Sequence, residues 1–265
     1  MEPPLEQRKI DEMEFHNRYR AIYEEGGPEW ERFVSNKKFY AIDRASRGYV
    51  ERWLRTNAVG KRVLDYGCGG GAYSLLAARS AARVDGVDIS DESVRLCRER
   101  AAAAGVADKC FFHVMDCENL GLPDDSFDVV CESGVLHHLD LTKVWPQMVR
   151  VLSPDGLVIC TEALVHNPLF QLYRRLTPHL RTVWETEHIL SVDQILGARR
   201  YFQDLDMRFF HLATLAAVPF RRLPVFGGIL SACEAVDSLL LRIPVVQRQA
   251  WMSVFTLGRP LKSSR

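Results

Sequence analysis

Three aspartates and a run of glycines have the residue types and the spacing of a site for a nucleoside-containing cofactor. Asp65 stands just before the glycine-rich segment Gly67–Gly71, in a stretch with the pattern strand, turn, helix. Glycines lack the Cβ atoms that keep backbone N–H groups away from a ligand, and a helix N-terminus attracts negative charge. Asp88 lies 23 residues after Asp65, where a carboxylate can accept hydrogen bonds from both hydroxyls of a ribose. Asp116 ends a further apolar run, and its carboxylate can accept a hydrogen bond from an adenine amino group.

Two cofactors fit this pattern. Gly67, Gly69 and Ala72 satisfy the G-x-G-x-x-A fingerprint of dinucleotide-binding folds, so NAD is a candidate beside S-adenosylmethionine (SAM). Each of the three aspartates also has a purely structural alternative, as the N-cap of a helix or as a turn residue. The glycines and carboxylates alone therefore predict a nucleoside and leave its identity open.

The chain around these residues alternates short apolar runs with helical stretches. The expected strands are Val63–Tyr66, Val84–Ile89, Cys110–Asp116, Phe127–Glu132 and Leu157–Glu162, and the expected helices are 72–81, 91–104 and 141–152. This alternation predicts an α/β fold with a parallel, doubly wound sheet and helices on both faces. In such a sheet ligands bind at the carboxyl ends of the strands, which is where Asp88 and Asp116 are expected to lie.

Outside this alternation we expect an arm and a cap. Residues 1–57 are expected to form an N-terminal helical arm, with an amphipathic helix over 37–57. Residues 58–265 are expected to form one domain, in which 163–206 and 216–247 are cap insertions. The remaining predicted elements are a helix over 192–203 after the N-cap Ser191, and strands over Met207–Leu215 and Gln249–Leu257.

Composition is typical of an ordinary globular protein. The 265 residues carry 34 Lys and Arg against 34 Asp and Glu, and this zero net charge argues against a general nucleic-acid binder. The seven cysteines are odd in number and include no C-x-x-C pair, so we expect reduced thiols, a cytoplasmic protein and no metal. The first residues lack the apolar core of a signal peptide, and no apolar run is long enough to span a membrane, so we expect neither.

Several segments occur in the order and spacing of one enzyme family. The stretch Val63–Gly71, with the sequence VLDYGCGGG, resembles motif I of class I SAM-dependent methyltransferases, and Val87–Ser90 resembles their acidic loop. Three later segments resemble the family's connections around the fourth and fifth strands: Leu122–Val130, Leu136–Leu139 and Val151–Leu157. The resemblance covers about residues 62–162 and is closest to methyltransferases of type 11 with small-molecule acceptors. It implies a Rossmann-like, mostly parallel seven-stranded sheet, with SAM as cofactor and S-adenosylhomocysteine as product.

The resemblance also implies which residues hold the cofactor. Those beside its methionine part would be Asp65, Gly67, Gly69 and Glu132. Those around its ribose and adenine would be Asp88, Ile89, Asp116 and Cys117. Tyr40 would help to close the pocket, as N-terminal aromatic residues do in such enzymes. Methyl transfer depends mainly on positioning and on at most one general base, and it requires no metal.

Two histidines are candidates for that base. His138 follows the fourth expected strand at the ligand-binding edge, and His188 lies among acidic residues after the fifth. Each also has a structural alternative, which for His138 is to hold the turn in which it lies. We expect the loss of His188 to lower turnover more than SAM affinity.

The region after the fifth strand is expected to select the acceptor. Its apolar segment 218–246 either packs as a helical pair on the sheet, or forms a hydrophobic acceptor site or a shallow membrane contact flanked by arginines. We predict O-methylation of a hydrophobic or aromatic small molecule, as in secondary metabolism, with nitrogen as the second choice of acceptor atom. The alternatives are an NAD-dependent oxidoreductase and a non-catalytic SAM-binding protein, and the sequence leaves the oligomeric state open.

Overall fold

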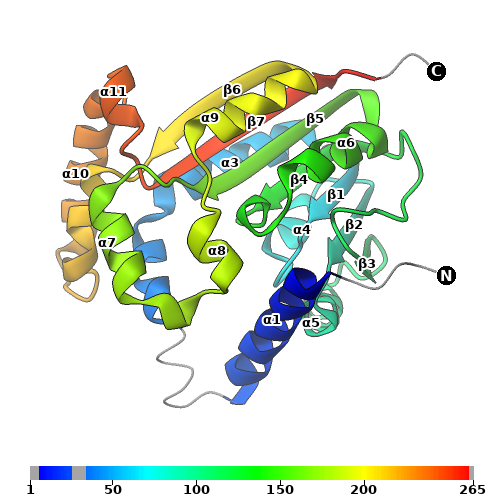
Figure 1. Ribbon diagram of the computed structural model, residues 1–265, viewed down its shortest axis with the longest axis horizontal. Coiled ribbons are helices and arrows are strands. Elements are labelled where there is room, and N and C mark those ends of the chain that lie inside the picture. Colours follow the sequence, from blue (N-terminus) through cyan, green and yellow to red (C-terminus); the bar gives the residue numbers. More distant parts are fainter. Residues whose placement is uncertain (1–5, 26–33, 263–265) are drawn as a thin grey trace.

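Seven strands form one sheet in the order β3-β2-β1-β4-β5-β7-β6 (Figure 1). The computed structural model describes residues 6–25 and 34–262. The strands are β1 Arg62–Tyr66, β2 Arg83–Asp88, β3 Cys110–Val114, β4 Phe127–Ser133, β5 Leu152–Ala163, β6 Phe202–Phe210 and β7 Met252–Pro260. Strands β1 to β5 pair in parallel, and β7 runs antiparallel to its neighbours β5 and β6. The expected doubly wound, mostly parallel seven-stranded sheet is confirmed.

Helices cover both faces of this sheet (Figure 1). The α-helices are α1 Gln7–Glu25, α3 Arg44–Asn57, α4 Ala72–Ala77, α5 Asp91–Ala103, α6 Leu141–Val151, α7 Pro168–Leu176, α8 Val183–Glu187, α9 Val192–Leu196, α10 Phe226–Leu240 and α11 Pro244–Gln247. The 3-10 helices are η1 Val34–Ile42, η2 Leu136–His138, η3 Pro178–Leu180, η4 Gly197–Arg200 and η5 Ala213–Phe220. Ser90 caps α5, as expected, by accepting a 3.0 Å hydrogen bond from the backbone N–H of Ser93. Among the described helices, none combines the length and the apolar composition needed to cross a bilayer.

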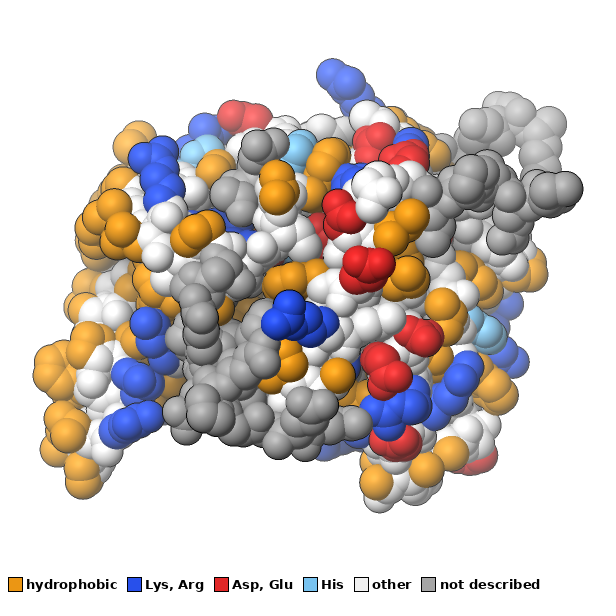
Figure 2. Space-filling model, turned by 60° about the horizontal axis from the view of Figure 1, so that its bottom comes forward, with side chains coloured by type: hydrophobic (Ala, Val, Ile, Leu, Met, Phe, Trp, Pro, Cys, Tyr) orange, Lys and Arg blue, Asp and Glu red, His pale blue; other side chains and the backbone are white. Residues whose placement is uncertain are grey.

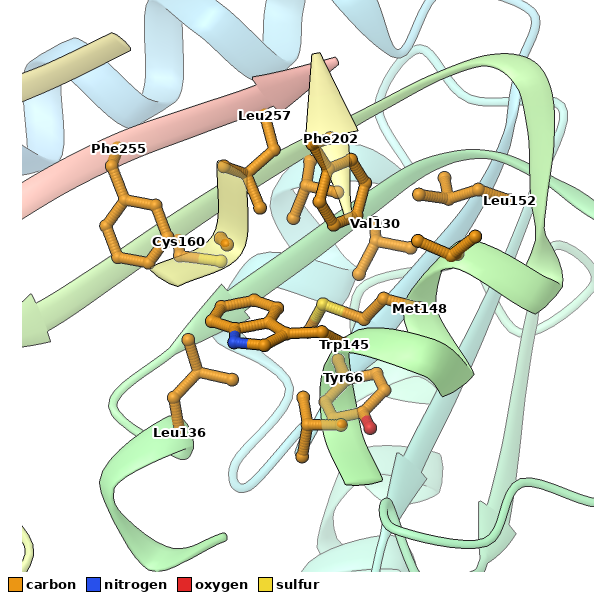
Figure 3. Packing of buried hydrophobic residues seen from close by; sticks show 14 of the residues in the cluster. Tyr66, Val130, Leu136, Trp145, Met148, Leu152, Cys160, Phe202, Phe255 and Leu257 are labelled. Carbon is orange, nitrogen blue, oxygen red and sulfur yellow. The ribbon is translucent and has the colours of Figure 1, made fainter. Parts of the chain in front are cut away.

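Apolar side chains bury the sheet on each face. On one face, α6 lays Trp145 and Met148 against side chains from the strands, among them Tyr66 and Val130 (Figure 3). On the other face, the contributions of α3 and α5 include Leu54 and Val94. The seven cysteines are free and six of them are buried, which agrees with the expected reduced thiols. This two-sided core holds the carboxyl ends of the strands in fixed positions.

Two predicted elements between residues 192 and 215 are wrong. The helix predicted over 192–203 ends early, as α9 followed by η4, and strand β6 already begins at Phe202. The strand predicted over Met207–Leu215 stops at Phe210, because His211 has a φ of 68° and turns the chain into η5. Pairing of β6 with β7 outweighs the local helical pattern. The predicted cap segment 163–206 therefore includes the first residues of a sheet strand.

Other predicted elements differ in their ends. The helix predicted over 37–57 is divided into η1 and α3, and the helix predicted over 72–81 ends at Ala77. The fifth strand begins earlier than predicted, at Leu152, and the last strand lies over Met252–Pro260. The divisions into arm, domain and cap stay predictions.

Candidate functional site

A cavity of about 200 Å³ lies beyond the carboxyl ends of the parallel strands, beneath α1. We call it the cofactor cavity. Six of the residues predicted to hold the cofactor line it: Gly67, Gly69, Asp88, Ile89, Asp116 and Cys117. Helix α1 supplies further lining residues that the sequence did not single out: Arg8, Lys9, Glu12, His16 and Arg20.

The glycine turn after β1 has the geometry that only glycine tolerates. Gly67 has a φ of 70°, and a Cβ added there would lie 2.5 Å from a methyl carbon of Val135. Gly69 also has a positive φ, of 50°. Positive φ values are costly for residues with a Cβ. The turn therefore keeps its backbone open to a ligand, as the sequence predicted.

Asp88 is held by the turn that it faces. One of its carboxylate oxygens accepts from the N–H of Gly69 at 2.8 Å, and the other accepts from the N–H of Ser90 at 2.9 Å. Each oxygen has a second lone pair, and the side chain lines the cofactor cavity. The carboxylate therefore fits the two hydroxyls of a ribose without moving.

Asp116 makes an ion pair that the sequence did not predict. Its Oδ1 accepts from the N–H of Glu118 at 2.8 Å, and its Oδ2 lies 2.7 Å from Nζ of Lys9. Lys9 also lies 2.9 Å from the carboxylate of Glu118. The Lys9 ammonium thus takes a position on Asp116 that the adenine amino group was predicted to occupy.

Asp65 does not line the cofactor cavity. Its geometry instead fits the structural alternative, in which the carboxylate caps the start of a helix. The side chain is buried, and its Oδ2 accepts from the backbone N–H of Ser74 at 2.8 Å and from the Ser74 hydroxyl at 2.5 Å. Burial raises the pKa of Asp65 to about 6. The carboxyl therefore ties β1 to α4 and shapes the glycine turn from behind.

Glu132 is likewise buried behind the cavity wall. Its Oε1 accepts from the N–H of Val135 at 2.6 Å, and Glu162 accepts from the N–H of Leu136 at 2.6 Å. Burial raises the pKa of Glu132 well above its usual range, and the charge of Glu162 adds to the effect. Glu132 therefore holds the η2 turn in place, and direct contact with the cofactor stays a prediction.

A second cavity, of about 1000 Å³, adjoins the cofactor cavity. Its aromatic lining residues are Phe15, Tyr19, Phe39, Tyr40, Phe170 and Trp251. Two buried arginines, Arg174 and Arg181, also reach it, and each lies 3.3 Å from the carboxylate of Glu185. Burial lowers the pKa of Arg174 to about 10. Tyr40 thus lies in this second cavity, with its ring 5.6 Å from Trp251, and it does not line the cofactor cavity.

His138 lines both cavities, and α1 provides its carboxylate partner. The Nδ1 atom of His138 lies 2.9 Å from Oε2 of Glu12. Burial lowers the pKa of His138, but the Glu12 carboxylate outweighs it and raises this pKa above its usual value. The neighbouring His137 lies 2.7 Å from Glu162, and burial lowers the pKa of His137 to about 3. Of these two histidines, His138 is the one that can exchange a proton near neutral pH.

His188 lies in neither cavity. Its ring stacks on Trp184 with centroids 3.6 Å apart, and its Nδ1 lies 2.9 Å from the Trp184 carbonyl oxygen. It lines a separate depression together with Leu139 and Tyr201. Because His188 lines neither cavity and His138 lines both, the geometry favours His138 over His188 as the base.

Comparisons with known proteins agree with this arrangement. Residues 64–160 match the family described as "Methyltransferase domain". The chain is 32% identical over 148 residues to the ubiquinone/menaquinone biosynthesis C-methyltransferase UbiE of Geotalea daltonii, which covers 54% of this chain and 62% of that protein. It is 29% identical over 214 residues to the UbiE protein of Geobacter sulfurreducens, covering 77% and 81%. Over 112 residues, 41% of each protein, it is 40% identical to the 27-O-demethylrifamycin SV methyltransferase of Amycolatopsis mediterranei.

The fold is also found among solved structures. The geranyl diphosphate C-methyltransferase from Streptomyces coelicolor A3(2), in complex with Mg²⁺, geranyl diphosphate and S-adenosyl-L-homocysteine, superposes with a TM-score of 0.61 at 16% identity. The match covers 97% of this chain and 100% of that protein. The sheet order, the glycine turn with Asp88 and the family match agree. The chain therefore contains a class I SAM-dependent methyltransferase domain, and its cofactor is SAM.

Proposed function

We propose that the protein transfers the methyl group of SAM to a hydroxyl oxygen of an apolar or aromatic small molecule. The observation that carries this proposal is His138, which lines both cavities and has a carboxylate partner in Glu12. A histidine so placed can accept the hydroxyl proton while the oxygen attacks the methyl carbon. The carbon–sulfur bond of the sulfonium breaks, an oxygen–carbon bond forms, and the Glu12 carboxylate stabilises the resulting imidazolium.

The character of the second cavity supports an apolar acceptor. Six aromatic side chains line it, and its two buried arginines already face Glu185. Glu185 offsets part of the charge of these two arginines, while Arg20, Lys37 and Arg47 also line the cavity, so an apolar acceptor that carries an anionic group fits it too. The relative from Amycolatopsis mediterranei, whose name specifies an O-methyl transfer, supports oxygen.

Carbon is the second candidate for the acceptor atom. The UbiE relatives and the geranyl diphosphate enzyme are named as C-methyltransferases. A carbon acceptor would use the same cavity. His138 would then remove a proton from the carbon that is methylated, or from a hydroxyl group elsewhere on the acceptor molecule. No feature of the described residues favours nitrogen.

The test supplies methyl-labelled SAM and a panel of apolar aromatic molecules that carry a hydroxyl, an amine or neither. We expect labelled product with the hydroxyl compounds, with the methyl group on oxygen by mass spectrometry. Methylation on carbon or nitrogen would overturn the oxygen assignment. SAM binding by calorimetry without any transfer would instead favour a protein that binds SAM without transferring its methyl group. The fold is not restricted to methyl transfer, because a protein named as a [4+2]-cyclase, SpnF, shares it with a TM-score of 0.54.

Two histidine variants test the choice of base. We expect His138→Ala to lower kcat about a hundredfold, the usual worth of a general base, with the Kd for SAM changed little. We expect His188→Ala to retain the wild-type kcat, because His188 lies outside both cavities. The reverse outcome would restore His188 as the base.

A further inference from the structure

Helix α10 and the short segments that flank it present an apolar, exposed outer side. Its large exposed side chains are Leu223, Val225, Val236, Leu239, Ile243 and Val245, which are between 45% and 79% exposed. We call these six side chains the α10 face. Figure 2 shows hydrophobic side chains gathered at the left edge of the molecule, the side on which Figure 1 places α10 and α11. Contiguous apolar surface of this kind marks an interaction site.

The inner side of α10 fixes which way this face points. Leu230 is buried in a cluster with Phe170 and Trp251, two residues that line the second cavity. Asp237 is buried too, and it accepts from the N–H of Ala213 at 2.6 Å and from the Thr214 hydroxyl at 3.0 Å. Because these contacts anchor the inner side, the helix cannot roll its apolar side chains inward.

Arginines border the α10 face. Arg222 and Arg242 lie next to its two ends in the chain, and Arg242 also lines a cavity of about 660 Å³ beside α10 with Arg52. These three side chains are exposed, and within 6–25 and 34–262 none of them forms an ion pair with an acidic side chain. Of the acidic residues between 219 and 250, Glu234 binds Arg44 and Asp237 is buried. The surroundings of the face are therefore positively charged.

We propose that the α10 face docks on an anionic lipid bilayer. A helix with an apolar side and flanking arginines lies in the plane of the interface, with its apolar side chains among the acyl chains and its arginines at the headgroups. A second copy of this chain fits less well. Antiparallel pairing of two α10 faces would bring Arg222 of one copy near Arg242 of the other, and like charges repel.

Docking would place the second cavity beside the lipid. The rings of Phe170 and Trp251 stand between the cavity and the inner side of α10, so one helical layer separates it from the proposed contact. The docking proposal stands apart from the choice of acceptor, since it rests on the outer side of α10 alone. It is tested without methyl transfer.

The first measurement is flotation of the full chain with two kinds of vesicle. One kind contains phosphatidylcholine only, and the other contains phosphatidylcholine mixed with anionic phosphatidylglycerol. We expect the mixed vesicles to bind at least about tenfold more tightly, and added salt to weaken that binding. Equal binding to both kinds, or binding to neither, would overturn the proposal.

Variants assign the binding to the α10 face. The double variant Val236→Glu, Leu239→Glu should lose at least about tenfold in affinity for the mixed vesicles, and Arg222→Glu, Arg242→Glu should lose the preference for anionic lipid. Val59→Glu is the matched control, because Val59 is 60% exposed at the turn before β1, and it should bind as the wild type does. Because all five positions are exposed, thermal unfolding and S-adenosylhomocysteine binding should be unchanged.

Sedimentation velocity tests a second copy of the chain as the occupant of the α10 face. A dimer that the double variant Val236→Glu, Leu239→Glu dissociates would assign the face to a second copy and overturn the proposal.

Discussion

At the scale of single residues, the site depends on carboxylates whose neighbours decide their roles. Asp65, Asp88 and Asp116 all follow from one sequence pattern, yet each has different partners. Asp65 is buried against Ser74, Asp88 is held open by backbone N–H groups, and Asp116 is paired with Lys9. A residue type at a strand end thus predicts a place in the site, while the surrounding donors decide what it can bind.

The clearest residue-scale prediction concerns Asp88. Asp88→Ala removes the acceptor for the ribose hydroxyls and also the acceptor for the Gly69 N–H. We expect the Kd for SAM to rise at least about tenfold, since each hydrogen bond to a charged group contributes about 1.5–3 kcal/mol. Isothermal titration calorimetry measures this change. Asp155→Asn, at an exposed position near the start of β5 and outside the cavity lining, is the control, and equal affinity for the two variants would contradict the ribose assignment.

The pair of Glu12 and His138 predicts a dependence on pH. The base must be neutral, so activity falls as the pH drops through the pKa of His138, which Glu12 raises. Glu12→Gln removes that charge and lowers this pKa, so the acid limb of the kcat profile should move to lower pH. Glu14→Gln, exposed on the same helix, should leave the profile unchanged. A profile insensitive to Glu12→Gln would remove His138 as the titrating base.

The pair of Glu12 and His138 also makes the stability of the fold depend on pH. Because the folded pKa of His138 is raised, its contribution is fully present below pH 6.5 and is lost as the pH rises through the folded pKa. The pKa of Glu12 is lowered by His138 despite burial, so its contribution is present above pH 4.5 and is lost as the pH falls through the folded value. The docking of α1 is therefore strongest between these two limits.

At the scale of elements, α1 covers the cofactor cavity through charge pairs. It lies beside α5 (Figure 1), where Asn17 donates to Asp91 at 2.7 Å. Arg8 donates to Glu118 at 2.6 Å, and Lys9 bridges Glu118 and Asp116. Helix α1 buries few apolar side chains, so these polar contacts supply much of its attachment. An element held in this way can open to admit a ligand and close over it.

The element-scale prediction follows from Lys9. Burial lowers the pKa of this ammonium, but its two carboxylate partners raise it further, so it stays charged. Lys9→Met removes the cation from Asp116, while Glu118 keeps Arg8, and the loss of this bridge loosens the closed position of α1. We expect S-adenosylhomocysteine to dissociate about tenfold faster in stopped-flow experiments, the effect of about 1.4 kcal/mol, with Lys61→Met, at an exposed turn, as the control. An unchanged dissociation rate would show that α1 does not retain the ligand.

At the scale of the whole molecule, one two-sided core supports both cavities. Met148 of α6 is fully buried beside Trp145 and Leu152 (Figure 3). Met148→Ala should lower the free energy of unfolding by about 2–5 kcal/mol in urea, because it leaves a cavity in this cluster. Leu169→Ala, at a position 76% exposed on α7, should change it by less than about 0.5 kcal/mol. S-adenosylhomocysteine should bind the folded Met148→Ala protein with nearly the wild-type Kd, and a large loss would mean that the core and the cavity are coupled.

The sequence by itself determined the sheet, the glycine turn and six residues of the cofactor cavity. These features depend on short segments, in which residue type and periodicity specify strand, turn and helix, and parallel strands bring their ends to one edge. The boundary errors near β6 arose because pairing with β7 is a long-range effect that no local pattern contains.

Only the tertiary structure decided which histidine faces the site and what covers it. Lys9 and Asp116 are separated by 107 positions in the chain, and Glu12 and His138 by 126, so no local spacing links them. The tertiary structure also places Tyr40 in the second cavity and His188 in neither cavity, and it leaves the α10 face exposed. The physical reason is that ion pairs and burial are properties of surfaces in contact, and those surfaces meet only when the helices pack on the finished sheet.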